Sequence, residues 1–446
     1  MFGNMLKKII KKFLPRSFLS TYHFFLAKLA NWFFLFPSNK IVVIGVTGTN
    51  GKTTTANLIS QLFECLGYKT GLTSTVNFKI GYQERLNDKK MTMLGRFQTQ
   101  KILYQAARAG CQYAIIETSS QGIEQWRHSG INYDVVVFTN LTPEHIEAHG
   151  SFENYRAQKE KLFEHLAKSR RKKIRGKVVP KIIIANADDE EIFRLKKYHS
   201  DKFISYGFVN KADYQGSDLR TAGGLASFKF AGQEINTQLL GEFNAYNVLA
   251  SLAVINALGL PADQVSACRV GGVPGRQEMI NQGQNFKVMI DYAPEPASLE
   301  KLYQALGSLP RRKLIHILGS TGGGRDQARQ PFLGRLAGQN ADVVIVTNED
   351  PYDDDPQTII DRVAKGAEQA GKKINQNLFK ILDRREAIAK AISLAQKDDL
   401  VLITGKGAEQ AICVANGKKI PWDDRRVTRE LIKEKTRNDS TKVKTE

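Results

Sequence analysis

The sequence predicts an α/β protein: a central domain with a phosphate-binding loop and a parallel sheet, followed by a smaller Rossmann-like C-terminal domain. A β-branched run at 41–44 leads through a glycine turn into a segment with helical spacing, the strand–loop–helix order of such a loop. In the last third of the chain, apolar strands alternate with polar turns and helical stretches, which predicts a second parallel sheet. The predicted divisions of the 446 residues are a basic amphipathic segment at 1–40, the central domain at 41–270, the C-terminal domain at 271–430 and a charged tail at 431–446.

The composition is that of a globular protein with a strongly basic balance. It is 42% hydrophobic and 25% charged, with a formal net charge of +20. Such a charge favours nucleic acid, an anionic membrane surface or polyanionic small substrates, and does not choose among them. The cysteines lie far apart without CxxC spacing, which indicates neither a zinc site nor a disulfide framework, so we expect reduced thiols in a cytoplasmic protein. They are Cys65, Cys111, Cys268 and Cys413.

Residues 1–40 contain basic and apolar side chains without a single acid. The aromatic second half carries His23, Lys28 and Asn31 and is too short and polar for a spanning helix, and no small-residue cleavage site is present. Two interpretations stay open: the segment lies on an anionic leaflet, or it is a helix whose aromatic face packs on the central domain. The basic residues are Lys7, Lys8, Lys11, Lys12, Arg16, Lys28 and Lys40.

The stretch 41–55, IVVIGVTGTNGKTTT, is the most informative part of the chain. Loop N–H groups and a helix N-terminus converge where backbone dipoles favour an anion, and Lys52 adds a positive charge for β/γ-phosphate oxygens. The hydroxyl of Thr53 suits Mg²⁺. The general pattern G-x-x-x-x-G-K-[ST] is only nearly met, because the chain has Val46 where the pattern requires Gly, and Gly45 one step earlier. The expected phosphate contacts are Gly48, Thr49, Asn50, Gly51, Lys52, Thr53 and Thr54.

Two later strands deliver polar side chains to the same edge of the sheet. After short strands at 70–75 and 76–80 and a helix at 98–109, a buried strand at 113–116 ends in Glu117. A carboxylate at the carboxyl end of a parallel strand lies where open α/β sheets bind ligands, and can hold Mg²⁺. The strand at 135–138 leads to His145, for which we expect a metal or phosphate role.

A helix at 151–168 places Tyr155, Leu162 and Phe163 inward, with Lys159 on or near that face. Periodicity alone makes Lys159 an ordinary solvated lysine. The central domain then continues through an exposed basic loop at 170–181, a strand at 182–185, hairpins at 214–240, a helix at 243–258 and a Gly- and Pro-rich linker at 271–278.

In the C-terminal part, strands are expected at 287–291, 314–318, 343–346 and 400–403. The turns that follow them gather at one edge of the sheet. They hold Arg325, Glu349, Asp350 and Glu409, which form either a site or ordinary polar loops. Beyond Val427 the chain is highly charged and is expected to fray.

A series of motifs, in order and in spacing, resembles the Mur ligases over residues 41–431. Within that family, the run from ETSS through QWR to GKGAE is most similar to the tripeptide synthetases. The motifs are TGTNGKTTT at 47–55, ETSS at 117–120, FTNLTPEHIEAHG at 138–150, YRAQKEKLF at 155–163, GEFNAYN at 241–247, PGRQE at 274–278 and GKGAE at 405–409.

The resemblance implies an ATP-dependent acid–amino-acid ligase of peptidoglycan precursor synthesis. In such ligases the γ-phosphate of ATP passes to a substrate carboxylate, and the amine of an amino acid then attacks the acyl phosphate. The resemblance also implies two Mg²⁺ sites, one at Thr53 and Glu117 and one at His145, with Lys159 carbamylated so that it becomes an anionic metal ligand. Lys52, His145 and Lys159 are the expected catalytic residues.

The same resemblance assigns the binding residues. Closure of the two domains around ATP would exclude water from the acyl phosphate. The expected ATP contacts are Asn244, Asn247, Arg276 and Asp291; the muramoyl-peptide contacts are Thr92, Ser119, Gln125 and Arg127; the amino-acid contacts are Arg325, Glu349, Asp350, Gly405 and Glu409.

Three departures from the family pattern bear on the substrates. The phosphate loop follows only a basic segment, where the tripeptide synthetases have a domain that grips the uridine nucleotide, so a UDP-linked and a lipid-linked acceptor both stay open. The sequence Glu-Asp-Pro-Tyr at 349–352 replaces Asp-Asn-Pro-Arg and removes the arginine that would hold the far carboxylate of diaminopimelate, so another amino acid such as lysine is expected. Ala408 and Pro294 stand where the family has His.

Two other functions are compatible with parts of the sequence. A folylpolyglutamate-synthase-like or other poly-amino-acid ligase keeps the chemistry and changes the substrate, but Ser119, Gln125 and Arg127 argue against it. A basic P-loop protein that binds nucleic acid belongs to another class, and the sequence has no helicase-like or base-stacking pattern, so no nucleic-acid partner is expected. The expected location is the cytoplasm, with peripheral contact to the inner membrane face if residues 1–40 bind lipid.

Overall fold

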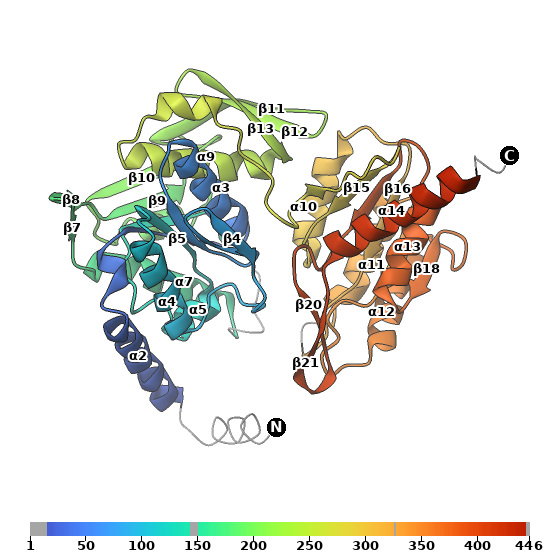
Figure 1. Ribbon diagram of the computed structural model, residues 1–446, viewed down its shortest axis with the longest axis horizontal. Coiled ribbons are helices and arrows are strands. Elements are labelled where there is room, and N and C mark those ends of the chain that lie inside the picture. Colours follow the sequence, from blue (N-terminus) through green and yellow to red (C-terminus); the bar gives the residue numbers. More distant parts are fainter. Residues whose placement is uncertain (1–15, 143–149, 325–326, 443–446) are drawn as a thin grey trace.

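The computed structural model describes residues 16–142, 150–324 and 327–442, which form two α/β units joined by a linker (Figure 1). The first unit, blue to yellow-green in Figure 1, is built on an 11-stranded sheet, and the second, yellow to red, on a 6-stranded sheet. Both sheets are parallel in their central strands, as the sequence predicts. Two of the predicted site residues, His145 and Arg325, lie outside the described residues.

The order of strands in the first sheet is β13-β12-β11-β10-β9-β6-β1-β5-β2-β3-β4. Val46 of β1 pairs with Glu117 of β5 on one side and with Val137 of β6 on the other, so the carboxyl ends of these three strands lie side by side. The bounds are β1 Val42–Thr47, β2 Thr70–Thr73, β3 Asn77–Ile80, β4 Gln83–Leu86, β5 Tyr113–Glu117, β6 Val135–Phe138, β9 Ile182–Asn186, β10 Lys202–Gly207, β11 Tyr214–Ala222, β12 Leu225–Phe230 and β13 Gln233–Leu240.

Helices cover both faces of this sheet. Helices α3 (Lys52–Cys65) and α9 (Glu242–Ala257) bury apolar side chains on one face. Helices α4 (Arg96–Arg108), α5 (Ser120–Glu124) and α7 (Phe152–Lys168) do so on the other. The remaining helices of this part are α2 (Arg16–Phe33), η1 (Pro37–Asn39), α8 (Ile192–Leu195) and η2 (Ala262–Ala267).

The second sheet has the order β14-β15-β19-β16-β17-β18 and is parallel except for β14. Helices α10, α11 and α12 pack on one face, and α13 and α14 on the other. The predicted strands are confirmed, whereas the short strands β14, β18, β20 and β21 are additions. The bounds are β14 Glu278–Met279, β15 Lys287–Ile290, α10 Pro296–Gly307, β16 Leu314–Leu318, α11 Arg329–Asn340, β17 Val343–Thr347, α12 Pro356–Gln369, β18 Leu378–Ile381, α13 Arg384–Leu394, β19 Leu400–Ile403, β20 Ala411–Val414, η3 Ala415–Gly417, β21 Lys418–Pro421 and α14 Asp424–Lys442.

The segment 170–181 is mostly exposed, as predicted, but the prediction of a loop is wrong, because the segment forms a hairpin of β7 (Lys172–Ile174) and β8 (Lys177–Val179). Lys172 is buried, and its Nζ lies 2.5 Å from Oδ2 of Asp134. Nζ of Lys181 lies 3.1 Å from the other oxygen of the same carboxylate. The sequence marked both lysines as solvated because their partner lies far away in the chain.

The prediction of fraying beyond Val427 is also wrong for the described residues. Helix α14 continues to Lys442, and Val427, Leu431 and Ile432 are buried against α13 and the second sheet. Lys433, Glu434 and Arg437 are exposed, whereas Asp424 is buried and pairs with Arg384 of α13. The narrow apolar stripe of this helix is stabilised by a neighbour that local composition does not reveal.

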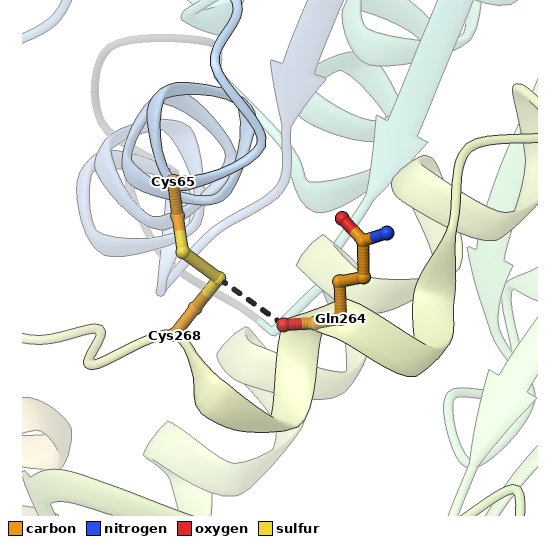
Figure 2. The surroundings of a disulfide bond; sticks show 3 residues. All are labelled: Cys65, Gln264 and Cys268. Carbon is orange, nitrogen blue, oxygen red and sulfur yellow. Dashed lines mark hydrogen bonds between the residues drawn. A yellow bond between two sulfur atoms is a disulfide. The ribbon is translucent and has the colours of Figure 1, made fainter.

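Two cysteines that we expected to be reduced are joined. Figure 2 shows the disulfide between Cys65, at the end of α3, and Cys268, after η2, with a sequence separation of 203. Sγ of Cys268 lies 3.7 Å from the carbonyl oxygen of Gln264, a contact without a donated proton because a disulfide sulfur carries no hydrogen. The fold brings the two Cα atoms to 6.0 Å, which spacing in the sequence could not indicate. Cys111 and Cys413 are free and buried.

Helix α2 packs one side on the first unit, where Ala27 and Ala30 are buried. Within the parts of the chain that the structure describes, no helix combines the length and the apolar character needed to cross a membrane.

Candidate active site

The phosphate-loop candidate lies between β1 and α3 and is fixed by the loop that follows β6. The amide of Thr49 donates to the carbonyl of Asn140 at 2.8 Å, and the amide of Asn50 donates to its side chain at 2.9 Å. Gly51 has φ +80, and a Cβ there would lie 2.2 Å from Oδ1 of Asn247, so only glycine fits. The loop is therefore a preformed turn at the amino end of α3, where its amides can meet an anion.

Two ammonium groups meet this loop. Nζ of Lys52 donates to the carbonyl of Thr49 at 2.6 Å, and Nζ of Lys159, from α7, donates to the carbonyl of Gly48 at 2.5 Å. Lys159 is 3% exposed, and its ammonium lies 4.6 Å from the centre of the Tyr155 ring. The structure thus brings Lys159 to the phosphate loop, although helical periodicity alone makes it a solvated lysine.

Thr53 and Glu117 form the metal candidate. Oγ1 of Thr53 donates to the two carboxylate oxygens of Glu117 at 3.0 and 3.1 Å, and Glu117 is 1% exposed. Thr75 also donates to this carboxylate, through its amide at 2.7 Å and its hydroxyl at 2.9 Å. The described residues contain no group of three or more His, Cys, Asp or Glu side chains arranged for a metal. Mg²⁺ commonly uses one or two carboxylates together with substrate phosphates, so a hydroxyl and a carboxylate beside the phosphate loop fit it.

Two asparagines of α9 lie behind the loop. Nδ2 of Asn247 donates to Oδ1 of Asn244 at 2.9 Å, and Oγ1 of Thr55 donates to Oδ1 of Asn247 at 3.2 Å. Nδ2 of Asn244 donates to Oε1 of Gln277 in the linker at 2.9 Å. The asparagines therefore tie α3 to α9 and α9 to the linker between the units.

Arg276, in the linker, and Asp291, after the first strand of the second unit that runs parallel to its neighbour, lie near the phosphate loop. Nη2 of Arg276 lies 3.5 Å from Oγ1 of Thr53, its guanidinium lies 4.4 Å from the centre of the Tyr292 ring, and its buried Nε has no hydrogen-bond partner among the described residues. Asp291 accepts the amide of Gln277 at 2.8 Å. Burial raises the pKa of Asp291, which nearby Arg276 partly offsets. An unsatisfied guanidinium N–H at the phosphate loop is suited to an anionic ligand.

The acceptor candidates lie on the far side of Glu117. Oγ1 of Thr92 lies 2.9 Å from Oγ1 of Thr75, within hydrogen-bond distance, and Ser119 and Arg127 line the same cleft. Gln125 does not line it; its Oε1 accepts from Nη2 of Arg127 at 2.7 Å, so it orients that guanidinium from behind. Burial lowers the pKa of Arg127.

The amino-acid candidates lie at the carboxyl edge of the second sheet. Glu349 accepts from Oγ1 of Thr321 at 2.7 Å, and burial raises its pKa. Gly405 has φ +101, and a Cβ there would lie 2.3 Å from Oε2 of Glu349, so glycine gives this carboxylate room. Asp350 and Glu409 both accept from Nζ of Lys406, at 2.8 and 2.7 Å.

Sequence reasoning missed four side chains of this site. Lys90, from the first unit, pairs with Asp350 and Glu409 of the second. Thr75 lies between Thr92 and Glu117. No local pattern in the sequence marks Lys90 or Thr75. Lys406, inside the GKGAE motif, could have been found from that motif. Arg329 of α11 pairs with Glu295 and lines the cleft.

The described candidates, with the exception of Gly48 and Gln125, line one cleft of about 1530 Å³ between the two units. Gly48 reaches it through its carbonyl contact with Lys159, which does line it. A phosphate loop, a carboxylate–hydroxyl pair, an acceptor wall and an acidic pocket therefore face one another across a single space. This arrangement can bring a nucleotide, a second anionic substrate and a third, amine-bearing substrate together.

Comparisons with known families agree along the chain. The Mur ligase middle domain family matches residues 46–255, and the family described as Mur ligase, glutamate ligase domain matches residues 275–407. A UDP-N-acetylmuramyl-tripeptide synthetase from Roseiflexus sp. (strain RS-1) is 38% identical over 423 residues, which cover 92% of this chain and 82% of the relative.

Solved structures are similar over the same range. A UDP-N-acetylmuramoyl-L-alanyl-D-glutamate–2,6-diaminopimelate ligase is 28% identical with a TM-score of 0.60, over 89% of this chain and 79% of that one. A folylpolyglutamate synthase from Mycobacterium tuberculosis has a TM-score of 0.63 at 18% identity, over 84% of this chain and 91% of that one. At that identity the second likeness shows the fold alone.

Proposed function

Because this chain belongs to the Mur ligase family, we propose that it joins an amino acid to the carboxylate of a muramoyl peptide through an acyl phosphate. It is an ATP-dependent acid–amino-acid ligase of peptidoglycan precursor synthesis. The observation that carries the proposal is the meeting of Lys52 and Lys159 at the phosphate loop, in the cleft that also holds the acceptor and amino-acid candidates.

In this proposal the nucleotide is bound by the loop of the first unit and by the linker. The loop amides and Lys52 bind the phosphates, Asn244 and Asn247 contact the nucleotide from α9, and Arg276 and Asp291 engage ATP when the domains close. Thr53 and Glu117 would hold one Mg²⁺, and His145 is proposed for a second. Mg²⁺ neutralises charge on the transferring phosphoryl group.

Lys159 is proposed to work as a carbamate. Carbamylation would convert its ammonium into an anion, which suits a metal beside the transferring phosphoryl group. The proposal is supported by the burial of Lys159 and by the reach of its Nζ to Gly48.

The acceptor is proposed to be a muramoyl peptide, linked either to UDP, as in the names of the relatives, or to a lipid. Arg127 would pair with an anionic group of the acceptor, with Gln125 orienting its guanidinium, and Thr92 and Ser119 would supply hydroxyls. The acceptor carboxylate would then lie near Glu117, where the phosphoryl group is transferred.

The incoming amino acid is proposed to lie between Arg325, Glu349, Asp350, Gly405 and Glu409. Solved relatives of this chain include a diaminopimelate ligase. Tyr352 follows Pro351 at the place where that branch has an arginine, so an amino acid without a second carboxylate, such as lysine, fits this proposal better.

One experiment tests these substrate assignments together. The full chain is incubated with ATP, Mg²⁺ and a panel of amino acids, with UDP-muramoyl-dipeptide, a lipid-linked precursor or folate as acceptor. Phosphate release and product mass are measured. A product mass equal to a muramoyl peptide plus one amino acid supports the proposal. Turnover only with folate would instead make the chain a folylpolyglutamate-synthase-like ligase.

Location and domain boundaries belong to the same proposal. We place the protein in the cytoplasm with peripheral contact of residues 1–40 to an anionic membrane, and divide it at residues 40 and 270, with α14 counted in the C-terminal domain. A band shift with nucleic acid that persists at moderate salt would favour the alternative of a basic nucleic-acid-binding protein.

A further inference from the structure

One side of α2 is apolar and faces solvent. Six large side chains are exposed here. Five of them repeat at intervals of four and three residues along one face of the helix, and Phe36 follows the end of the helix in a left-handed backbone conformation. We call this set the apolar ridge. It comprises Phe18 (57% exposed), Tyr22 (52%), Phe25 (65%), Leu29 (49%), Trp32 (63%) and Phe36 (44%).

The opposite side of α2 is fixed to the first unit, so the ridge cannot turn inward. Ala27 and Ala30 are buried there, and a Cβ on Gly130 would lie 2.5 Å from the carbonyl oxygen of Ala27. Nζ of Lys28 donates to the carbonyl of Ser129 at 3.0 Å. The helix is packed by one face and leaves a continuous apolar face uncovered, which in soluble proteins marks an interaction surface.

The sequence around this face is basic, and its described part carries the exposed Lys28 and Lys40. The first acidic residue of the chain is Glu64, whereas residues 1–40 contain the seven basic residues named above. The β7–β8 hairpin adds exposed Lys173, Arg175 and Lys177. Nζ of Lys172 in this hairpin donates to the carbonyls of Ser38 and Ile41, at 2.6 and 3.0 Å, directly after the ridge ends. Figure 1 shows α2 below the first unit and the β7–β8 hairpin at the left edge of that unit.

We propose that the apolar ridge and the β7–β8 hairpin together bind the surface of an anionic lipid bilayer. Aromatic side chains with polar edges favour the boundary between headgroups and acyl chains, and cations beside them attract anionic headgroups. A second copy of the chain is a poorer occupant, because pairing two such surfaces brings their like charges together. In this arrangement α2 lies in the plane of the bilayer surface.

The surface adjoins the acceptor wall of the cleft. Nε1 of Trp126 donates to Oγ of Ser20 in α2 at 2.6 Å, and the rings of Phe24 and Trp126 lie 5.4 Å apart. Trp126 stands between Gln125 and Arg127, which are proposed to receive the acceptor. Membrane contact through α2 therefore places this wall near the lipid, and, resting on the proposed function, it favours an acceptor whose lipid tail lies in the same bilayer.

The first test uses vesicle binding of the full chain and needs no ligase activity. Phosphatidylcholine vesicles with about one third phosphatidylglycerol should bind the protein, vesicles of phosphatidylcholine alone should bind much less, and salt should weaken binding. The double variant Phe25→Ser/Trp32→Ser should lose at least about tenfold in affinity, and Lys173→Glu/Lys177→Glu should also bind more weakly. The control Phe193→Ser removes an aromatic ring, 71% exposed, from α8 of the same unit and should bind like the unaltered chain.

A second readout reports the depth of the ridge. Brominated lipids should quench tryptophan emission of the unaltered chain, and the quenching should be lost in Trp32→Phe, which keeps an aromatic ring. The proposal is overturned if Phe25→Ser/Trp32→Ser, the ridge variant, binds vesicles as tightly as the unaltered chain, or if the unaltered chain binds neutral and anionic vesicles equally. It is also overturned if neither protein binds vesicles and the unaltered chain is a dimer whereas the ridge variant is a monomer.

An experiment that compares two acceptors separates this inference from the ligase proposal. The ratio of rates with lipid-linked and UDP-linked acceptor in anionic vesicles should fall in the ridge variant. If the chain binds vesicles but no muramoyl acceptor is ligated, the ligase proposal fails and the membrane surface stands. An unchanged ratio overturns the link between the surface and the acceptor.

Discussion

Nζ of Lys90, in the first unit, lies 2.5 Å from Oδ2 of Asp350 in the second unit, although 260 residues separate them in the chain. The same ammonium lies 3.0 Å from Glu409 and 3.1 Å from the carbonyl of Ala411, so its three donors meet three acceptors. Burial disfavours the charge of Lys90, but the Coulombic attraction of Glu409 and Asp350 outweighs it and raises the pKa of this ammonium. The two units are thus joined by a buried charge network inside the cleft.

A second group of hydrogen bonds, close to Lys90 in the sequence, surrounds the metal candidate. Two residues after Lys90, Oγ1 of Thr92 lies 2.9 Å from Oγ1 of Thr75, and the Thr75 hydroxyl donates to Glu117, which also accepts from Thr53. The contact of Lys90 with the second unit therefore lies two residues along the chain from a group of hydrogen bonds that ends at the phosphate loop.

Replacing Lys90 by Met should weaken the docking of the two units during ligation. We expect kcat/KM for the amino acid to fall by at least about tenfold, because a buried carboxylate loses one cation, while ADP affinity changes little. Ligation kinetics at varied amino acid and calorimetric ADP binding measure the two effects.

The matched control is the neighbouring Lys89→Met, since Lys89 is exposed and pairs only with Asp88 in the described structure. Lys90→Arg should retain more activity than Lys90→Met. Equal kcat/KM in Lys90→Met and Lys89→Met would show that the interdomain pair has no part in the reaction.

Lys159→Ala should abolish ligation and regain part of it in added short-chain carboxylate. The reason is that a free carboxylate can replace the proposed carbamate group in the space left by the shortened side chain. Initial rates with and without acetate measure it, with a loss of at least about a hundredfold expected.

Lys168→Ala, on the exposed part of the same helix, serves as the control and should keep its rate without acetate. Full activity of Lys159→Ala without additive would contradict the carbamate. A mass increase corresponding to bound CO₂ on the intact protein would support it independently of activity.

Acid should destabilise the first unit through buried histidine. Burial lowers the pKa of His165 to about 4 from its ordinary 6.5. Between these values the unfolded chain binds a proton that the folded chain does not, so the free energy of unfolding falls by about 1.4 kcal/mol for each unit of decreasing pH from this residue alone.

Urea unfolding at about pH 6 and about pH 5 measures this slope. In His165→Gln the free energy of unfolding should depend less steeply on pH, by the amount that corresponds to the uptake of about one proton on unfolding, whatever the stability of the variant at neutral pH. Buried His128 and His316, whose pKa values burial also lowers, keep part of the slope in the variant. Parallel slopes in the two proteins would rule out this role of His165.

The disulfide should be countable and stabilising. Thiol labelling of the denatured chain should find two free cysteines, and four after reduction. Because the bond closes a loop of 203 residues, chain-entropy reasoning gives about 5 kcal/mol as an upper estimate for its contribution.

Melting curves with and without reductant measure the loss. Cys65→Ser should melt at the temperature of the reduced protein and should no longer respond to reductant. Four labelled thiols before reduction would mean that the bond does not form.

The sequence by itself determined the elements whose signals are local. The strand–loop–helix at 41–63, with Lys52 and Thr53 consecutive, and the strand ending in Glu117 could be predicted because backbone geometry and nearest neighbours fix them. Lys159 was predicted only from the family resemblance. Its contact with Gly48 joins residues 111 positions apart, so helical periodicity cannot indicate it.

Only the tertiary structure decided the pairings between distant residues. Lys90 with Asp350, Cys65 with Cys268, Lys172 with Asp134 and the buried stripe of α14 depend on elements that meet only after folding. The same holds for the apolar ridge: the sequence showed that α2 is amphipathic, but which face is covered depends on Gly130 and Ser129 of the first unit. Burial and long-range charge, not local propensity, set these contacts, and they are properties of the assembled fold.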